Sequence, residues 1–257
     1  MAFRKTEAIT LFRRDYSETS QVIIFYTADY GKILVLARGN KRPKHSQLEP
    51  IDLLAHSEIV FLDKTPKGLH LLTEYTLKDG FPGLRERLER IYQGIYLAEF
   101  LDELTEAGDS NRGLFNLTLE TLKRLQNSSN GLEPLFYFES LALKYLGFIP
   151  RLITDLSESG FRCGLCNNRI GDKPNLRFSS RHGGVLCDRC SPGNETIAVT
   201  PGILRIIMWC AGESRFNEAE PRLKVSLKMQ QELRGFLDYY IASIVGRELN
   251  TAKWLTK

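Results

Sequence analysis

The chain has 257 residues, of which 42% are apolar and 26% charged, a composition typical of a folded globular protein long enough to bury a sizeable core. No segment approaches the ~18 consecutive apolar residues of a membrane-spanning helix, and the start, MAFRKTEAIT, lacks the apolar core of a secretion signal. We therefore expect a cytoplasmic protein without a membrane segment.

The net charge of +4 is distributed unevenly along the chain. Residues 1–80 carry 12 Lys and Arg against 10 Asp and Glu, residues 81–150 carry 7 against 10, and residues 151–257 carry 16 against 11. The total indicates little by itself. The basic first part, acidic middle and basic last part are compatible with a nucleic acid that contacts the ends of the chain.

The first 80 residues predict a series of short strands. β-Branched and aromatic segments alternate with turn residues, and the segments span 7–15, 20–28, 32–38, 53–64 and 69–77. A closed barrel removes exposed strand edges, so five short strands favour a five-stranded oligonucleotide-binding (OB-fold) barrel over residues 1–80. A small SH3-like barrel is the alternative.

A basic segment, LARGNKRPKHSQ at 36–47, joins the third and fourth predicted strands. Gly39, Asn40 and Pro43 oppose regular structure there. The cations of this loop include Arg38, Lys41, Arg42 and Lys44. Their close spacing on a loop suits contact with a phosphate backbone. A merely solvated loop is the simpler alternative.

Aromatic residues lie close in sequence to further cations, among them Arg13 and Arg14. These aromatic residues are Phe3, Phe12, Tyr16, Phe25, Tyr26 and Tyr30. Rings that stack on bases, next to cations that meet phosphates, characterise single-strand binding surfaces. Alternating aromatic residues in strands also form cores, and both interpretations remain open.

After the break KDGFPG at 78–83 the pattern becomes helical. Apolar residues spaced three and four apart predict helices from Leu84 to Leu101, through Phe115 to Leu122, over 134–147, and from Met229 to Val245, with Arg234 among the basic residues around the last one. We expect an α-helical bundle domain at 81–257. The first helix carries acids that suit solubility or a protein partner rather than DNA: Glu86, Glu89, Glu99, Asp102, Glu103 and Glu106.

Two CxxC pairs, twenty residues apart, are the strongest local motif. They comprise Cys163, Cys166, Cys187 and Cys190. Two such knuckles supply four thiolates for a tetrahedral zinc ion. Disulfides conflict with the missing secretion signal, and a redox motif does not explain the repetition. We predict one structural Zn²⁺ per chain in a zinc-ribbon insertion at about 160–195, with His182 on its surface and Cys210 as a buried thiol outside it.

No catalytic motif accompanies these elements. The patterns GxxxxGK[ST], GxSxG and HExxH are absent, so we expect a protein that is not an enzyme. Two alternatives stay open: a metal-dependent nuclease whose acids converge only in the fold, and a protein-interaction scaffold that does not bind DNA.

The order of these parts resembles the bacterial recombination mediator family RecO. The resemblance is carried by TEAITLFRRDYSETSQVIIFYTADYGKILVLARGNKRPKHSQLEPIDLL, LGFIP before the first cysteine pair, GGVLCDRC at the second, and LDYYIASIVGREL near the end. It covers nearly the whole chain. One departure is the longer spacer RLITDLSESGF ahead of Cys163.

The resemblance implies a DNA repair and homologous recombination mediator of the RecF pathway, cytoplasmic and nucleoid-associated. Such proteins bind single- and double-stranded DNA, anneal complementary strands, engage the acidic C-terminal tail of single-stranded DNA-binding protein (SSB), and work with RecR to load RecA. The positions it implies as phosphate contacts are Arg38, Lys41, Arg42 and Lys44, with Lys32, Arg13 and Arg14 as weaker candidates. It places the SSB-tail pocket only in the helical domain.

Overall fold

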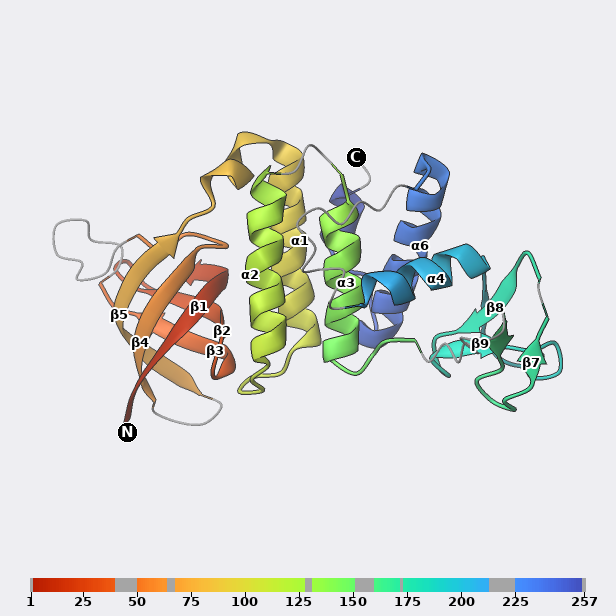
Figure 1. Ribbon diagram of the computed structural model, residues 1–257. Coiled ribbons are helices and arrows are strands. Elements are labelled where there is room, and N and C mark those ends of the chain that lie inside the picture. The colour runs from red at the N-terminus through yellow and green to blue at the C-terminus, as the bar shows by residue number, and fades with distance from the viewer. Residues whose placement is uncertain are drawn as a thin grey trace. The chain divides into compact units, whose positions relative to one another are not determined.

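The computed structural model describes residues 2–39, 50–63, 68–127, 131–150, 160–171, 173–212 and 225–255 (Figure 1). They form two compact units. The first unit is Met1–Pro134 with Leu249–Lys257, and the second is Leu135–Glu248. The first unit includes two long helices that follow the N-terminal strands, and the domain division near residue 80 stays a prediction. No helix within the described ranges combines the length and apolar character needed to cross a membrane.

Five strands of the first unit close into a barrel. They are β1 (Ala2–Asp15), β2 (Gln21–Thr27), β3 (Gly31–Ala37), β4 (His56–Asp63) and β5 (Leu69–Asp79). The order is β1–β2–β3–β5–β4, and β1 pairs with β4 to complete the circle. All pairings are antiparallel except β3 with β5. This closed five-stranded barrel confirms the predicted OB-fold class.

Alternate strand residues fill the barrel interior. In β3, Ile33, Val35 and Ala37 are buried, whereas Leu34 between them is exposed. Phe25 from β2 is fully buried in the same core. Each fully buried large apolar side chain contributes about 1.5–3 kcal/mol, so the barrel is stabilised mainly from within.

The turn before β3 lies against the segment that connects two helices. Gly31 has φ +61°, and a Cβ there would lie 2.1 Å from the carbonyl oxygen of Asp109. The amide of Gly108 donates to the carbonyl of Lys32 at 3.0 Å. Only glycine therefore permits this close approach of the two backbones.

The helices of the first unit are η1 (Pro82–Glu86), α1 (Leu88–Leu104) and α2 (Arg112–Asn127), and α1 and α2 lie beside the barrel (Figure 1). The short η2 (Ala252–Trp254) returns to α1. There the carboxylate of Glu99 accepts hydrogen bonds from the backbone amides of Asn250 and Thr251, both at 2.9 Å. Because α1 and α2 start and end near the predicted positions, the helical periodicity identified them correctly.

The second unit combines helices with small strands. Its helices are α3 (Glu133–Tyr145), α4 (Pro201–Cys210) and α6 (Leu227–Val245). Its strands are β6 (Phe161–Arg162), β7 (Arg169–Ile170), β8 (Leu176–Ser179), β9 (Gly184–Leu186) and β10 (Ile197–Val199). The ring of Phe178 in β8 packs edge-on against Phe236 and Tyr240 of α6, with centroids 4.9 and 5.4 Å away. Aromatic packing thus fixes the short β-sheet on the last long helix.

Candidate nucleic-acid interface and metal centre

Three strand ends meet at one end of the barrel. Asp15 at the end of β1 pairs with Gln21 at the start of β2, and Gln21 pairs with Ala37 at the end of β3. Arg14 precedes Asp15, and Arg38 follows Ala37, so the register places both arginines at this end. We call it the β1–β2–β3 end of the barrel.

Arg14 and Arg38 are both exposed, and neither forms an ion pair with another described residue. The other predicted cations of the loop, Lys41, Arg42 and Lys44, lie outside the described residues. An exposed guanidinium that forms no ion pair keeps its full charge for a ligand. Arg14 and Arg38 meet this condition among the described residues, although the exposed acids Asp15 and Glu18 lie at the same end of the barrel.

Arg13 and Lys32, also predicted as phosphate contacts, are engaged within the protein. The Nη1 atom of Arg13 donates to the carbonyl of Ile51 at 2.7 Å and lies 3.4 Å from the carboxylate of Asp52. Lys32 is half-buried, and its Nζ donates to the backbone carbonyl and the carboxylate of Asp102, the latter at 3.1 Å. Contact with DNA would require exchange of these internal contacts.

A row of apolar side chains crosses the outer face of the barrel, near the strand ends that carry Arg14 and Arg38. Phe12 of β1 lies opposite Ile24 of β2, Ile24 lies opposite Leu34 of β3, and Leu34 lies opposite Leu69 of β5. Phe12, Leu34 and Leu69 remain 48%, 39% and 38% exposed. Sequence reasoning missed this outer row; its signal was the apolar residues on both faces of KILVLAR.

The structure shows which of the aromatic residues near the predicted DNA site are in the core and which are exposed at the surface. Phe25 and Tyr26 are fully buried and belong to the core. Tyr30 is half-buried and packs edge-on against Phe61, with centroids 5.5 Å apart. Phe12 and Tyr16 are exposed at the β1–β2–β3 end, and Phe3 is exposed near the start of β1. Only the exposed rings are available for stacking.

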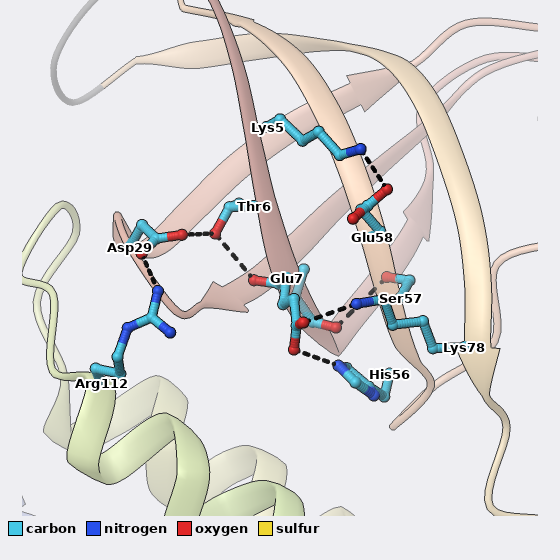
Figure 2. Close-up of polar contacts among 10 residues, drawn as sticks. Lys5, Thr6, Glu7, Asp29, His56, Ser57, Glu58, Lys78 and Arg112 are labelled. Atoms are coloured by element: carbon cyan, nitrogen blue, oxygen red, sulfur yellow. Dashed lines mark hydrogen bonds and ion pairs between the residues drawn. The ribbon is translucent and has the colours of Figure 1, made fainter.

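Elsewhere on the barrel the cations are matched by acids (Figure 2). Lys5 lies 2.7 Å from the carboxylate of Glu58, and Lys78 lies 2.7 Å from that of Glu7. The hydrogen bond from Lys78 holds the pKa of Glu7 below its usual range. The Arg112 guanidinium of α2 donates to Asp29 in the turn before β3, and this pair joins the helix to the barrel.

The four predicted cysteine ligands converge in the second unit. Their Sγ atoms all lie within 4.8 Å of one another, and those of Cys166 and Cys187 are 3.7 Å apart. A tetrahedron with metal–sulfur bonds of about 2.3 Å has sulfur–sulfur edges of about 3.8 Å, so the cluster fits a four-sulfur metal site. Among the described residues, no other group of three or more ligand side chains lies close enough to hold a metal ion.

Each knuckle is built by its own backbone turn. The amide of Asn167 donates to the carbonyl of Cys163 at 2.9 Å, and the amide of Cys190 donates to that of Cys187 at 3.0 Å. Between the knuckles, a turn at the Gly183–Gly184 pair has Gly183 at φ +60°. His182 lies outside the cluster, with its Nδ1 3.1 Å from the hydroxyl of Ser179.

The charge state of the cluster favours a bound cation. Burial raises the pKa of the Cys163 thiol, but backbone amides of Cys166, Cys187 and Leu165 outweigh burial and bring it to about 6. Hydrogen bonding with Cys166 and Cys187 raises the pKa of Cys190 to about 12. A bound metal ion would stabilise the thiolate form of all four cysteines. Cys210 is buried and lies outside the cluster, as predicted.

Two models of the same protein family together match nearly the whole chain. The family model "Recombination protein O N terminal" matches residues 1–81, and "Recombination protein O C terminal" matches residues 85–253. The chain belongs to the RecO family. The resemblance predicted from the sequence is thereby confirmed, and the chain is a DNA repair protein of this family.

Curated RecO proteins of several bacteria are similar over most of their length. "DNA repair protein RecO" of Syntrophomonas wolfei is 32% identical over 253 residues, which cover 98% of this chain and 95% of the relative. That of Rhodopirellula baltica is 35% identical over 190 residues, 73% of this chain and 67% of the relative. That of Alkaliphilus metalliredigens is 29% identical over 238 residues, 92% of each. The fold and the family therefore agree on a recombination and repair role.

Proposed function

We propose that this RecO-family chain binds single- and double-stranded DNA at the β1–β2–β3 end of its barrel and anneals complementary strands without bond-making chemistry. The observation that carries the proposal is the contrast between Arg14 and Arg38, which have no acidic partner among the described residues, and the paired Lys5 and Lys78. The first two cations are available for phosphates, and the other two are already neutralised.

The outer row gives this surface the second property that a single-strand site needs. The rings of Phe12 and Tyr16 offer faces for base stacking beside the arginines, and Leu34 and Leu69 extend the apolar surface. Stacking and phosphate neutralisation leave the hydrogen-bonding edges of the bases free. A strand held in this way can still pair with its complement, which is the requirement for annealing.

Further contacts complete the proposed DNA site. Lys41, Arg42 and Lys44, which lie outside the described residues, are proposed as additional phosphate contacts. We propose Arg13 and Lys32 only as weaker phosphate contacts, because DNA must displace their ion pairs with Asp52 and Asp102.

The proposed partners and cofactor follow from family membership and the cysteine geometry. We propose that the chain acts on SSB-coated DNA, with RecR and the SSB tail as partners, to help load RecA. We further propose that the metal of the four-cysteine cluster is Zn²⁺, held by Cys163, Cys166, Cys187 and Cys190. Bound zinc supplies a structural cross-link, because the four cysteines leave no open coordination position.

The DNA proposal is tested by fluorescence anisotropy with labelled oligonucleotides over a salt series. The variant Arg14→Gln with Arg38→Gln is compared with Lys5→Gln with Lys78→Gln, which removes the same net charge from paired positions of the same barrel. We expect the first variant to lower the steepness of the log affinity against log salt plot for single strands by about 1.4, that is, about 0.7 for each lost phosphate contact. The paired variant is expected to retain the wild-type slope.

Replacement of the exposed rings separates stacking from charge. We expect Phe12→Ala with Tyr16→Ala to weaken single-strand binding by about 1–3 kcal/mol per lost stacking contact and to leave the salt slope unchanged. Equal salt slopes in the two charge variants would remove the β1–β2–β3 end from the proposal. Cleavage of the oligonucleotides with added Mg²⁺ or Mn²⁺ would favour the nuclease alternative instead.

A further inference from the structure

A pocket in the first unit lies where the start of α1 meets the C-terminal segment. It has a volume of about 220 Å³ and is lined by Leu88, Glu89, Tyr92, Gln93, Trp254 and Leu255. At about 30 Å³ for each water molecule, this volume corresponds to about seven water molecules, enough room for one long side chain. The DNA-binding proposal makes no use of this pocket.

Two aromatic rings form the apolar wall of the pocket. The rings of Tyr92 and Trp254 are 5.4 Å apart with an angle of 35° between their planes, and both side chains are half-buried. The segment that carries Trp254 is anchored to α1 through Glu99, which accepts hydrogen bonds from Asn250 and from the amide and hydroxyl of Thr251 at 2.6–2.9 Å. The wall is therefore held by specific contacts.

Two side chains of the lining, Glu89 and Gln93, offer acceptor oxygens without a partner within the described residues, beside the donors of the Tyr92 hydroxyl and the Trp254 indole. Glu89 is exposed, and its carboxylate forms no ion pair with another described residue. Gln93 is only 4% exposed; its Nε2 donates to the carbonyl of Gly131 at 3.2 Å, whereas its Oε1 is buried without a hydrogen-bond partner in the described part of the chain. A buried acceptor without a donor costs about 1–3 kcal/mol, which a ligand with N–H groups would recover.

We propose that this pocket binds an arginine side chain of a partner protein. A guanidinium is planar and cationic, so it stacks on the Tyr92 and Trp254 rings while its N–H groups point to Glu89 and Gln93. A phosphate or a carboxylate offers no donor to either acceptor. The acidic balance of residues 81–150 also favours a cationic partner at α1 over DNA.

One competing occupant is an acidic segment, which would use the exposed Lys253 beside Trp254 rather than Glu89. The two occupants differ in the sign of their charge. Short peptides that carry one charge of either sign therefore distinguish them directly.

The chain has two tryptophans, so Trp209→Phe leaves Trp254 as the reporter in the full-length protein. The probes are the blocked tripeptides Gly-Arg-Gly, Gly-Glu-Gly and Gly-citrulline-Gly, the last being a neutral analogue of the first. We expect a saturable change of Trp254 fluorescence with the arginine peptide, with a dissociation constant on the order of 1 mM. The citrulline and glutamate peptides are expected to bind about tenfold more weakly or not at all.

Matched variants locate the binding. Glu89→Gln is expected to weaken arginine binding about threefold, as the loss of one exposed ion pair does. Glu106→Gln, an exposed acid outside the pocket, is expected to change nothing. Because Trp254→Leu could loosen the C-terminal segment, Tyr92→Leu serves as the second wall variant, and it is expected to weaken binding about fivefold.

Several results would overturn the proposal. They are a lack of saturation at arginine concentrations about tenfold above the expected constant, equal binding of the citrulline peptide, and preferential binding of the glutamate peptide with dependence on Lys253. Retained binding in the folded Glu89→Gln and Tyr92→Leu variants alike would also overturn it. None of these results depends on DNA binding, so this proposal and the proposed function fail separately.

Discussion

The clearest stability prediction concerns a charged group buried in the second unit. Arg234 of α6 is 2% exposed and Glu139 of α3 is fully buried, and two hydrogen bonds of 2.9 and 2.8 Å join their side chains. The carboxylate of Asp238, one turn further along α6, also lies 2.8 Å from Arg234. The perturbation is Glu139→Gln, which keeps the shape of the side chain and removes its charge.

The expected cost follows from the burial of the pair. Removal of one partner from a buried ion pair costs about 3–5 kcal/mol, because the remaining charge stays desolvated. Asp238 still contacts Arg234 in the variant, so we expect the low end, about 3 kcal/mol. With a urea dependence of about 2 kcal/mol per molar, the unfolding midpoint of the second unit falls by about 1.5 M.

The assay is urea unfolding of the Trp254→Phe protein, in which Trp209 reports on the second unit through its contact with Tyr137. Glu232→Gln, an exposed acid on the same helix as Arg234, is the control and is expected to shift the midpoint by less than about 0.3 M. The double variant Glu139→Met with Arg234→Met replaces this pair by apolar groups of similar length but leaves the carboxylate of Asp238 without its cation, so we expect it to be more stable than Glu139→Gln and less stable than wild type. A midpoint of Glu139→Gln equal to that of wild type would show that the pair is hydrated and refute this reasoning.

Three further outcomes test other parts of the fold. Elemental analysis is expected to find one zinc per chain, and Cys166→Ser is expected to lose it together with the circular-dichroism signal of the small strands; metal-free protein with four titratable thiols would contradict this. Hydrogen bonds from Thr251 and Asn250 outweigh burial and lower the pKa of Glu99 below its usual 4.5, so Glu99 stabilises the C-terminal segment above that pH and ceases to do so as the pH falls through the lowered value. Trp254 fluorescence in the Trp209→Phe protein is therefore expected to shift to the red on acidification, and Glu99→Gln to show that shift already at neutral pH. Lys32→Met is expected to destabilise the first unit by about 1 kcal/mol through loss of the Asp102 contact, with a smaller effect on DNA affinity than Arg38→Gln; the opposite order in anisotropy would restore Lys32 as a main phosphate contact.

Local sequence patterns were sufficient for most of the elements and for the cluster of four cysteines, although α4 was not predicted. Strands such as 32–38 are recognisable by residue type and by the turns on either side, and a knuckle such as CGLC fixes two ligands within one turn. The helix from Leu227 to Val245 ends at Gly246, whose φ is +84°, and its apolar stripe was visible as a spacing of three and four. Each of these features depends on residues within one element or one turn.

Features that depend on distant partners could not be predicted in the same way. Arg234 looked like one more basic residue around an amphipathic helix, because its partner Glu139 lies 95 residues earlier. The anchor between Glu99 and Thr251 spans 152 residues and draws the end of the chain into the first unit. The register of β3 beside β5, which places Leu34 next to Leu69, follows from barrel closure rather than from either strand alone.

Counting charges along the sequence also fails to show which cations are paired with acids in the fold. Residues 1–80 carry nearly equal numbers of cations and acids, and their balance of +2 does not indicate where a polyanion would bind. The fold shows which of these cations are ion-paired: Lys5, Lys78 and Arg13 each lie within 3.4 Å of a carboxylate. Arg14 and Arg38 have no such neighbour among the described residues, although Arg14 directly follows the paired Arg13 in sequence. The proposed phosphate surface therefore depends on which cations the fold leaves without acids, and strand register decides that pairing.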